Sequence, residues 1–223
     1  MVYVGLVDGE RFNFMASGSL WHDALVMLDE ESGSLWSQIS GECIKGPKEG
    51  TKLQLFKSNH TTVADFKKQY PNGVLLKKPE KGLEGSVYNN YFASPGRFGV
   101  FGRMYEFEKI PQKSYVYGLR LADKDISVTK EYLSKNNYTF VSGDNYKVIM
   151  VFDSNTESIA AFYIDPNLDY KVDDNLILAG ENSWNAFTGQ SIDKNIKALE
   201  SIPVISAYWF AWFNFFPNTE LIN

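Results

Sequence analysis

The 223-residue chain has little sulfur and little imidazole from which a reactive site could be built. It contains one cysteine, Cys43, and two histidines, His22 and His60. A single cysteine excludes an internal disulfide and any metal cluster held by several thiolates, and it leaves the compartment open. The sequence therefore predicts no disulfide framework, no metal site and no cofactor.

The chain also lacks an excess of positive charge. Its 22 lysines and arginines are outnumbered by 27 aspartates and glutamates, which gives a formal charge of −5 and a pI near 5.2. A protein that binds nucleic acid needs a basic surface to neutralise phosphates. Because the lysines are scattered or lie beside acidic residues, we expect no nucleic-acid partner.

Long hydrophobic runs are absent as well. The most apolar segment, residues 202–216, is interrupted by Pro203 and Asn214 and is shorter than the roughly 20 residues that a membrane helix needs. It is interpreted as a buried helix, so no membrane span is expected. The first twelve residues have no basic start, no long apolar stretch and no small-residue cleavage site, so no signal peptide is predicted.

Apolar residues and internal similarity, by contrast, are plentiful. Hydrophobic residues make up 44% of the chain, which is enough to build the core of a globular protein. Residues 34–44 read SLWSQISGECI and residues 182–192 read NSWNAFTGQSI. Each segment has a tryptophan, then a hydroxyl or amide side chain, then Ser/Thr-Gly and an isoleucine. Such a recurrence indicates an internal duplication.

The sequences that precede the two tryptophans repeat the same order of elements. VYVGLV-DGE-RFNFMA in the first copy and KVIMVF-DSNTES-IAAFYI in the second are two apolar or alternating runs joined by turn residues, which predicts β-hairpins. ALVMLDEESGS and NLILAGENS then lead directly into the tryptophans. Each copy is therefore expected to contain a further hairpin there.

Each copy is expected to end in a short helix, a Pro-Asn turn and an edge strand. TTVADFKKQYPNGVLL and AYWFAWFNFFPNTELI both place two aromatic residues four positions apart before Pro-Asn. On a helix this spacing brings Phe66 next to Tyr70 and Trp212 next to Phe216, and the proline ends the helix. The second copy has an additional strand pair and a short helix near residues 129–135, which the first copy lacks.

The predicted fold class is α+β and β-rich, with two related antiparallel-sheet units that each carry a short helix near their end. Residues 1–80 form the first unit, which lacks its opening section, and residues 108–223 form the complete second unit. Residues 81–107, rich in Gly, Pro and Lys, are the connector. The aromatic run of residues 208–216 is expected at the seam between the units and in the core, with a homo-oligomer surface as the alternative.

The chain resembles the bacterial domain-of-unknown-function family 3179. The stretch FNFMASGSLWHDALVMLDEESGSLWSQISGECIKGPKEGTKLQLF is similar to the family's signature of Phe, Ser-Gly, L-V-M-Y-D, S-L-W-S-Q, G-P and G-x-x-L. The ending YWFAWFNFFPNTEL is similar to the family's F-x-F-A-W-x-x-F-P-D-T close. The resemblance implies no particular activity, because the family has no established one, and it implies relatives that are often exported or membrane-tethered.

One departure from the family pattern narrows what the resemblance implies. Members typically carry a His-Glu near an Asn-Asp and a Cys-Pro-Leu-Cys segment just before the strand that begins here at Val2. The present sequence starts after that point, and residues 153–157 in the second copy hold neither cysteine nor histidine. Any metal, redox or thiol site that the family has there is expected to be missing from this chain.

The candidates for ligand contact are Trp21, His22, Asp29, Trp36, Gln38 and Trp184. Trp36 and Trp184 could wall a matched pair of sites for a sugar ring, but we favour the interpretation that each indole anchors a core. Asp29 matches the aspartate of the family's L-V-M-Y-D segment and is expected to hydrogen-bond the backbone of the following turn.

Three hypotheses on function remain open. The favoured one is a non-catalytic module that binds a small molecule or a partner protein in a cleft between the units, lined by exposed aromatics such as Trp21, Tyr88 or Tyr91. The second is a hydrolase that uses His22 or a carboxylate at the Asp29 turn. The third is a truncated member that lost its activity with its opening section. No residue is assigned a catalytic role.

Overall fold

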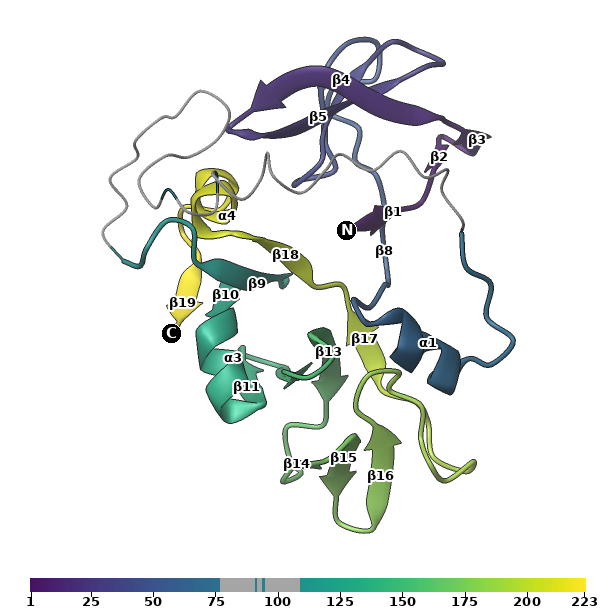
Figure 1. The fold of residues 1–223 in the computed structure, drawn as a ribbon, viewed down its shortest axis with the longest axis vertical. Helices are drawn as coiled ribbons and strands as arrows, with labels where there is room; N and C mark the ends of the chain where they lie inside the picture. The colour runs from purple at the N-terminus through teal and green to yellow at the C-terminus, as the bar shows by residue number, and fades with distance from the viewer. Residues whose placement is uncertain (77–90, 92–93, 95–108) are drawn as a thin grey trace.

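The structure is a computed structural model that describes residues 1–76, 91, 94 and 109–223 (Figure 1). Strands dominate these residues, and the helices with described bounds are α1 (Val63–Gln69), α3 (Lys130–Asn136) and α4 (Trp209–Phe215). The predicted β-rich α+β class, with several antiparallel sheets, is confirmed. We call residues 1–76 the N-terminal part and residues 109–223 the C-terminal part.

The N-terminal part is built from hairpins. Its main sheet has the antiparallel order β4-β5-β6-β7, while β1 pairs with β8 and β2 with β3. His22 and Asp23 connect β4 to β5, and both have the positive φ (50° and 59°) that a type I′ turn requires. The strands are β1 (Val2–Tyr3), β2 (Leu6–Val7), β3 (Glu10–Arg11), β4 (Phe14–Trp21), β5 (Ala24–Asp29), β6 (Leu35–Ser37), β7 (Cys43–Lys45) and β8 (Leu55–Phe56).

The described residues of the C-terminal part form sheets with the orders β18-β9-β10-β19, β11-β12-β13-β17 and β14-β15-β16. Strand β19 runs parallel to β10, whereas β18 and β10 are both antiparallel to β9. The strands are β9 (Tyr115–Arg120), β10 (Asp125–Thr129), β11 (Tyr138–Ser142), β12 (Lys147–Asp153), β13 (Ser158–Ile164), β14 (Lys171–Asp173), β15 (Leu176–Ala179), β16 (Asn182–Asn185), β17 (Glu200–Ile202), β18 (Ile205–Tyr208) and β19 (Glu220–Ile222).

Strand β12 lies at the centre of the C-terminal part. Val148 and Met150 pack in one buried cluster with residues of β9, β10 and α3. Ile149 and Val151 pack in another cluster, which contains Trp184. Both faces of the strand are therefore covered, which explains why its sequence is a continuous apolar run rather than an alternating one.

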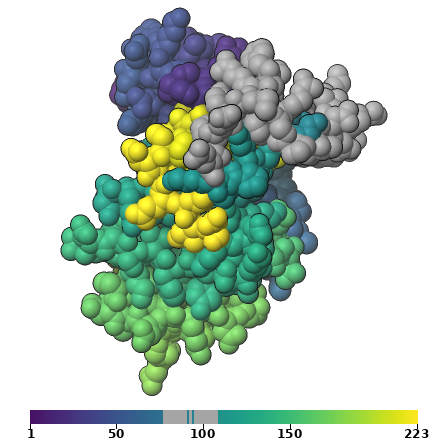
Figure 2. Space-filling view, turned by 90° about the vertical axis from the view of Figure 1, so that its left-hand side faces the viewer, coloured from purple at the N-terminus to yellow at the C-terminus, as the bar shows by residue number. Residues whose placement is uncertain are grey.

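Helix α4 lies where the two parts meet. Trp209 and Trp212 are fully buried, in a cluster with Ala24 and Ile39 of the N-terminal part as well as residues of β9 and β18. Figure 1 shows α4 below the β4-β5 hairpin, and Figure 2 shows the C-terminal residues in yellow between the N-terminal part and the teal body of the molecule. The aromatic run is therefore largely buried, and it packs against residues of both parts of the chain.

The predicted short helices are present with their predicted side-chain neighbours. Helix α3 begins after Thr129, whose hydroxyl accepts a hydrogen bond from the third residue beyond it. The ring centroids of Phe66 and Tyr70 are 5.6 Å apart on α1, and those of Trp212 and Phe216 are 4.3 Å apart at the end of α4. None of the helices that the structure describes is long and apolar enough to cross a membrane.

Two sequence expectations are wrong. Residues 202–216 are not one helix: Pro203 separates β17 from β18, which pairs with β9, and the helix begins only at Trp209. Residues 74–76 form no strand. Val74 and Leu76 are 89% and 87% exposed, whereas the corresponding segment at the end of the chain, β19, pairs with β10. A strand requires a partner, and no described strand pairs with residues 74–76.

Candidate functional site

Asp29 is the centre of a buried polar network at the turn between β5 and β6. Its carboxylate accepts hydrogen bonds from the backbone N–H groups of Ser32, Gly33 and Ser34 at 2.5, 3.1 and 3.2 Å and from the Ser32 hydroxyl at 2.8 Å. The indole N–H of Trp36 donates to the same carboxylate at 2.7 Å. The expected hydrogen bonds between the Asp29 carboxylate, as acceptor, and the backbone of the following turn are therefore present.

The environment of Asp29 favours its ionised form. Burial acts to raise the pKa of this carboxyl, but the hydrogen bonds from Trp36, Ser32 and Ser34 outweigh burial and hold the pKa below its ordinary value. A carboxylate with all of its lone pairs occupied and no exposed surface is not available to a substrate. The geometry therefore assigns Asp29 to the turn rather than to acid–base chemistry.

The two tryptophans of the repeated segments are both core residues. Trp36 is 0% and Trp184 is 5% exposed. Their indole N–H groups have different acceptors, because Trp36 donates to a carboxylate and Trp184 donates to the carbonyl of Lys197 at 2.9 Å. Indoles with this little exposed surface present no stacking face to a ligand, so the core interpretation of both residues agrees with the structure.

The turns that follow the tryptophans have the same hydrogen bonds. Gly41 donates to the carbonyl of Ser37 at 2.9 Å, and Gly189 donates to the carbonyl of Asn185 at 2.9 Å. Each glycine carbonyl then accepts at 2.8 Å from the backbone of a later leucine, Leu53 or Leu199. The two glycines have φ of +69° and +70°, so both occupy the left-handed region expected for a turn.

Both glycines also lie against an aromatic ring. A Cβ added to Gly41 would approach a ring carbon of Tyr3 to 2.7 Å, and a Cβ added to Gly189 would approach a ring carbon of Phe162 to 2.5 Å. The Tyr3 hydroxyl continues this contact by donating to the carbonyl of Gln38 at 2.7 Å. The structure thus places the candidate Gln38, which is half-buried, beside a packing contact.

The polar residues proposed for a hydrolase are not brought together. His22 is exposed at the tip of the β4-β5 hairpin, where its ring lies 4.6 Å from that of Trp21 and 5.4 Å from that of Phe215. Within residues 1–76 and 109–223, no hydroxyl, thiol or carboxylate is hydrogen-bonded to its imidazole. Cys43 is buried, and burial raises the pKa of its thiol. The geometry gives the His22 hydrolase hypothesis no support.

One cavity between the two parts is lined by Trp21, which the sequence predicts as a candidate for ligand contact. It has a volume of about 330 Å³, and its aromatic lining is Trp21 from the N-terminal part and Phe215 and Phe216 from the C-terminal part, with the rings of Trp21 and Phe215 5.2 Å apart. The charged groups around it are already paired, since Arg120 lies 3.2 Å from Asp125 and Lys52 lies 3.6 Å from Glu42. This cavity therefore offers aromatic surface but little uncompensated charge.

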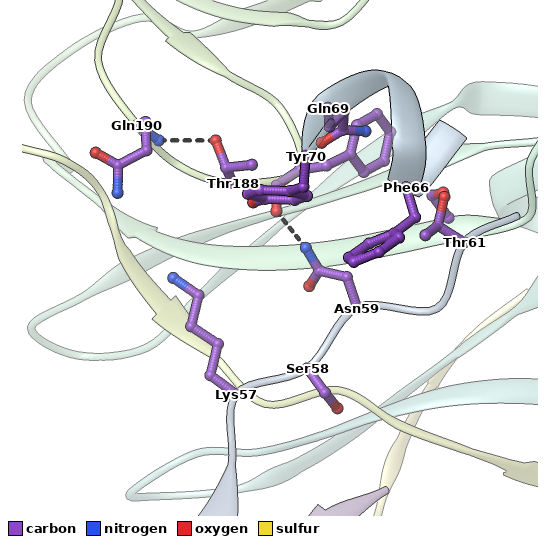
Figure 3. A pocket seen from close by; sticks show the side chains of 11 residues that line it. Lys57, Ser58, Asn59, Thr61, Phe66, Gln69, Tyr70, Thr188 and Gln190 are labelled. Atoms are coloured by element: carbon purple, nitrogen blue, oxygen red, sulfur yellow. Dashed lines mark hydrogen bonds between the residues drawn. The ribbon is translucent and has the colours of Figure 1, made fainter. Parts of the chain in front are cut away.

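A larger cavity, of about 430 Å³, lies between the segment that contains α1 and the turn that follows Trp184, residues 187–190 (Figure 3). We call it the larger cavity. Phe66 of α1 and Tyr70, the residue after α1, line one wall of it. Thr188 and Gln190 of the turn line the other wall. The side-chain amide of Asn59 crosses from one wall to the other and donates to the carbonyl of Phe187. Figure 3 shows the rings of Phe66 and Tyr70, the Asn59 amide and the Lys57 ammonium gathered around this space.

Sequence reasoning missed the residues of this larger cavity. It predicted that Phe66 and Tyr70 are neighbours but not that Tyr70 is 49% exposed. Of the other predicted cleft aromatics, Tyr91 has the Lys113 ammonium 3.8 Å from its ring centre, and Tyr88 lies outside the described residues. The sequence contains no local signal for this exposure, because residues from elsewhere in the chain determine whether a ring at the end of a helix is buried.

A comparison with protein families matches residues 1–219 to DUF3179, whose description is "Protein of unknown function". The match covers almost the whole chain. The chain belongs to the DUF3179 family. Comparisons of this DUF3179 protein with curated proteins and with solved structures find no match. The family membership confirms the resemblance seen in the sequence.

Replacement of Asp29 by Asn is expected to lower the free energy of unfolding by about 3 kcal/mol at pH 7, because buried donors then face a neutral amide. The folded-state pKa of Asp29 is lowered, so its contribution is complete above the unfolded pKa of about 4 and is lost as the pH falls through the folded pKa. Urea unfolding at several pH values measures this difference. Glu30→Gln, an exposed change in the same turn, is the control. If Asp29→Asn lowers the free energy of unfolding by the same amount at all pH values, Asp29 does not stabilise the fold as an ionised carboxylate.

Gly41→Ala and Gly189→Ala are each expected to destabilise the protein more than Gly33→Ala. Gly33 has φ of +69° but no atom within 4 Å of an added Cβ, so its substitution measures backbone strain alone, about 1 kcal/mol. The two turn glycines add a clash with Tyr3 or Phe162. Urea midpoints compare the three variants, and equal losses in all three would show that the rings move aside at no cost.

Proposed function

We propose that this DUF3179 protein is a non-catalytic binding module and that its ligand occupies the larger cavity, between residues 57–70 and residues 187–190. The observation that carries the proposal is the composition of the walls. Exposed aromatic surface from Tyr70 lies beside the Gln190 amide, the Thr188 hydroxyl and one cation, Lys57. A few polar groups around an apolar floor are typical of binding sites.

We also propose that the chain consists of two related units, residues 1–80 and 108–223, joined by the connector 81–107. The matched turns at Gly41 and Gly189 support this proposal. The strand pairs next to these turns support it too, because Tyr3 of β1 lies opposite Leu55 of β8, and Phe162 of β13 lies opposite Ser201 of β17. On this proposal the larger cavity lies between the two units.

The ends of α1 and α4 support the same correspondence. The residues that cap the two helices, Tyr70 and Phe216, have nearly equal backbone angles, with φ and ψ of −128° and 76° in the first and −132° and 67° in the second. After the Pro-Asn pair, Gly73 donates to the carbonyl of Tyr70 at 2.8 Å and Thr219 donates to that of Phe216 at 3.1 Å. Two segments with one local geometry thus lie in different surroundings.

The chemistry of the cavity favours a ligand that is uncharged or carries a single negative charge. Lys57 is the charged side chain among the described residues of its lining, and the remaining polar groups are amides and hydroxyls. Amides donate and accept hydrogen bonds, so they suit a ligand that presents both kinds of group. Phe66 and Tyr70 add ring surface for an apolar face of the ligand.

The proposal is tested by titrating the ¹⁵N-labelled protein with glucose, N-acetylglucosamine and trialanine at millimolar concentration. At least one probe is expected to shift the amide resonances of Asn59, Thr188 and Gln190. Tyr70→Ala is expected to weaken that binding about tenfold, the loss of roughly one aromatic contact.

Trp21→Ala is the matched control, because it removes an aromatic side chain from the other cavity. It is expected to leave the binding unchanged. The proposal is overturned if none of the probes shifts resonances of the larger cavity, or if Trp21→Ala abolishes the binding and Tyr70→Ala does not.

A further inference from the structure

The strand that precedes α4, β18, is paired with another strand, and the segment that precedes α1 can be compared with it. Strand β18 pairs antiparallel with β9, with Ile205 opposite Gly118 and Ala207 opposite Val116. The ring of Trp212 lies directly on the same glycine, since a Cβ on Gly118 would approach a ring carbon to 2.1 Å. Strand β9 is thus hydrogen-bonded to β18 along its edge and covered by Trp212 of α4 on its face.

The residues that precede β9 also complete the first turn of α4. Trp209 donates its backbone N–H to the carbonyl of Ser114 at 2.8 Å, and Phe210 donates to the carbonyl of Gln112 at 3.0 Å. Helix α4 has no side-chain cap. Its free N–H groups are satisfied instead by the segment that leads into β9.

Residues 59–62 correspond to β18 on the alignment of the two helices, but no described strand pairs with them. Among the described residues, no backbone hydrogen bond involves residues 58–61. Helix α1 supplies its own cap, because the hydroxyl of Thr62 accepts from the backbone of Asp65 at 3.1 Å. The described residues of the N-terminal part therefore leave unpaired the backbone groups that correspond to those of β18 that bind β9.

The aromatic face of α1 is correspondingly uncovered. Tyr70 is 49% exposed, whereas its counterpart at the end of α4, Phe216, is 6% exposed. Phe66 corresponds to Trp212, and it lines the larger cavity where Trp212 contacts β9. The cavity thus runs along residues 57–61 and against Phe66, at the place that β9 takes in the C-terminal part.

We propose that the larger cavity is a seat for an extended polypeptide segment of another protein, which adds to residues 58–61 as an antiparallel strand. This inference rests on the proposed function, since it names the ligand of the same cavity. Main-chain hydrogen bonds hold the segment, as in other cases of strand addition. A small residue of the segment faces Phe66, as Gly118 faces Trp212, and an acidic side chain is favoured near Lys57.

The probe is an end-blocked, fluorescein-labelled peptide of residues 114–121, SYVYGLRL, which carries the change Arg120→Glu. The pairing of Ile205 with Gly118 places position 120 opposite the counterpart of Lys57, where an acidic side chain is favoured. Fluorescence anisotropy with the full chain is expected to give a Kd on the order of 100 μM, because an unstructured peptide loses conformational freedom on binding. The resonances of Asn59, His60 and Thr61 are expected to shift in the ¹⁵N spectrum.

Two N-methylated forms of the peptide distinguish strand addition from apolar contact. Successive N–H groups of a strand point to opposite sides, so only one alternate set faces residues 58–61. Methylation of one set, at the positions of Val116 and Gly118 or at those of Tyr115 and Tyr117, is expected to weaken binding at least about tenfold, and methylation of the other set is expected to have little effect.

Phe66→Ala is expected to weaken the binding of the peptide, and Val63→Ala, on the same helix but not in the lining, is the control. Gln190→Trp blocks the cavity from the opposite wall without changing α1, and it replaces Phe66→Ala if that variant does not fold.

The strand proposal is overturned if peptide binding is insensitive to both N-methyl sets, or if the peptide shifts only amide resonances of residues outside the cavity. If a small molecule of the earlier titration binds in the cavity and the peptide does not, the binding module stands and strand addition is wrong.

Discussion

The contact of the Trp212 ring with Gly118 is the packing interaction on which the arrangement of the molecule depends. A side chain at position 118 would occupy the place of the ring, so this position must be glycine for α4 to lie on the sheet. The same buried cluster includes Ala24 and Ile39 from the N-terminal part. One close approach between a helix and a strand therefore positions the core of the C-terminal part and its seam with the N-terminal part.

Local turn chemistry explains how much of the fold the sequence could predict. Apolar runs separated by Asp, Gly, Asn and Ser predicted the hairpins, because these residues adopt the backbone angles of turns or hydrogen-bond the turn backbone. The Pro-Asn pairs predicted the ends of α1 and α4. The contact between Phe66 and Tyr70 followed from helical spacing alone. Each of these features depends on residues close together in the chain.

The errors concern features that depend on a distant partner. The segment that contains Val74 resembles β19 in sequence, but only β19 lies next to β10. Likewise, Ile205 and Ala207 could have continued a helix, and pairing with β9 makes them a strand. The larger cavity was missed for the same reason, because the exposure of Tyr70 depends on which distant residues pack against its ring.

Turn chemistry recurs in this chain more widely than the tryptophan segments indicate. Asp153 accepts from the backbone of Asn155 and from the hydroxyl of Thr156, each at 2.8 Å, and that hydroxyl also lies 2.7 Å from the hydroxyl of Ser158. Asp29, Ser32 and Ser34 form a similar set of bonds in a different hairpin. The same kind of aspartate turn thus stabilises two different hairpins, so its presence at Asp29 does not indicate a function. On the proposed division into two related units, the informative positions are those where corresponding segments have different surroundings. Of these, α1 and residues 58–61 border a cavity, and no described residue is hydrogen-bonded to the backbone of residues 58–61, which is why we propose that the ligand binds there.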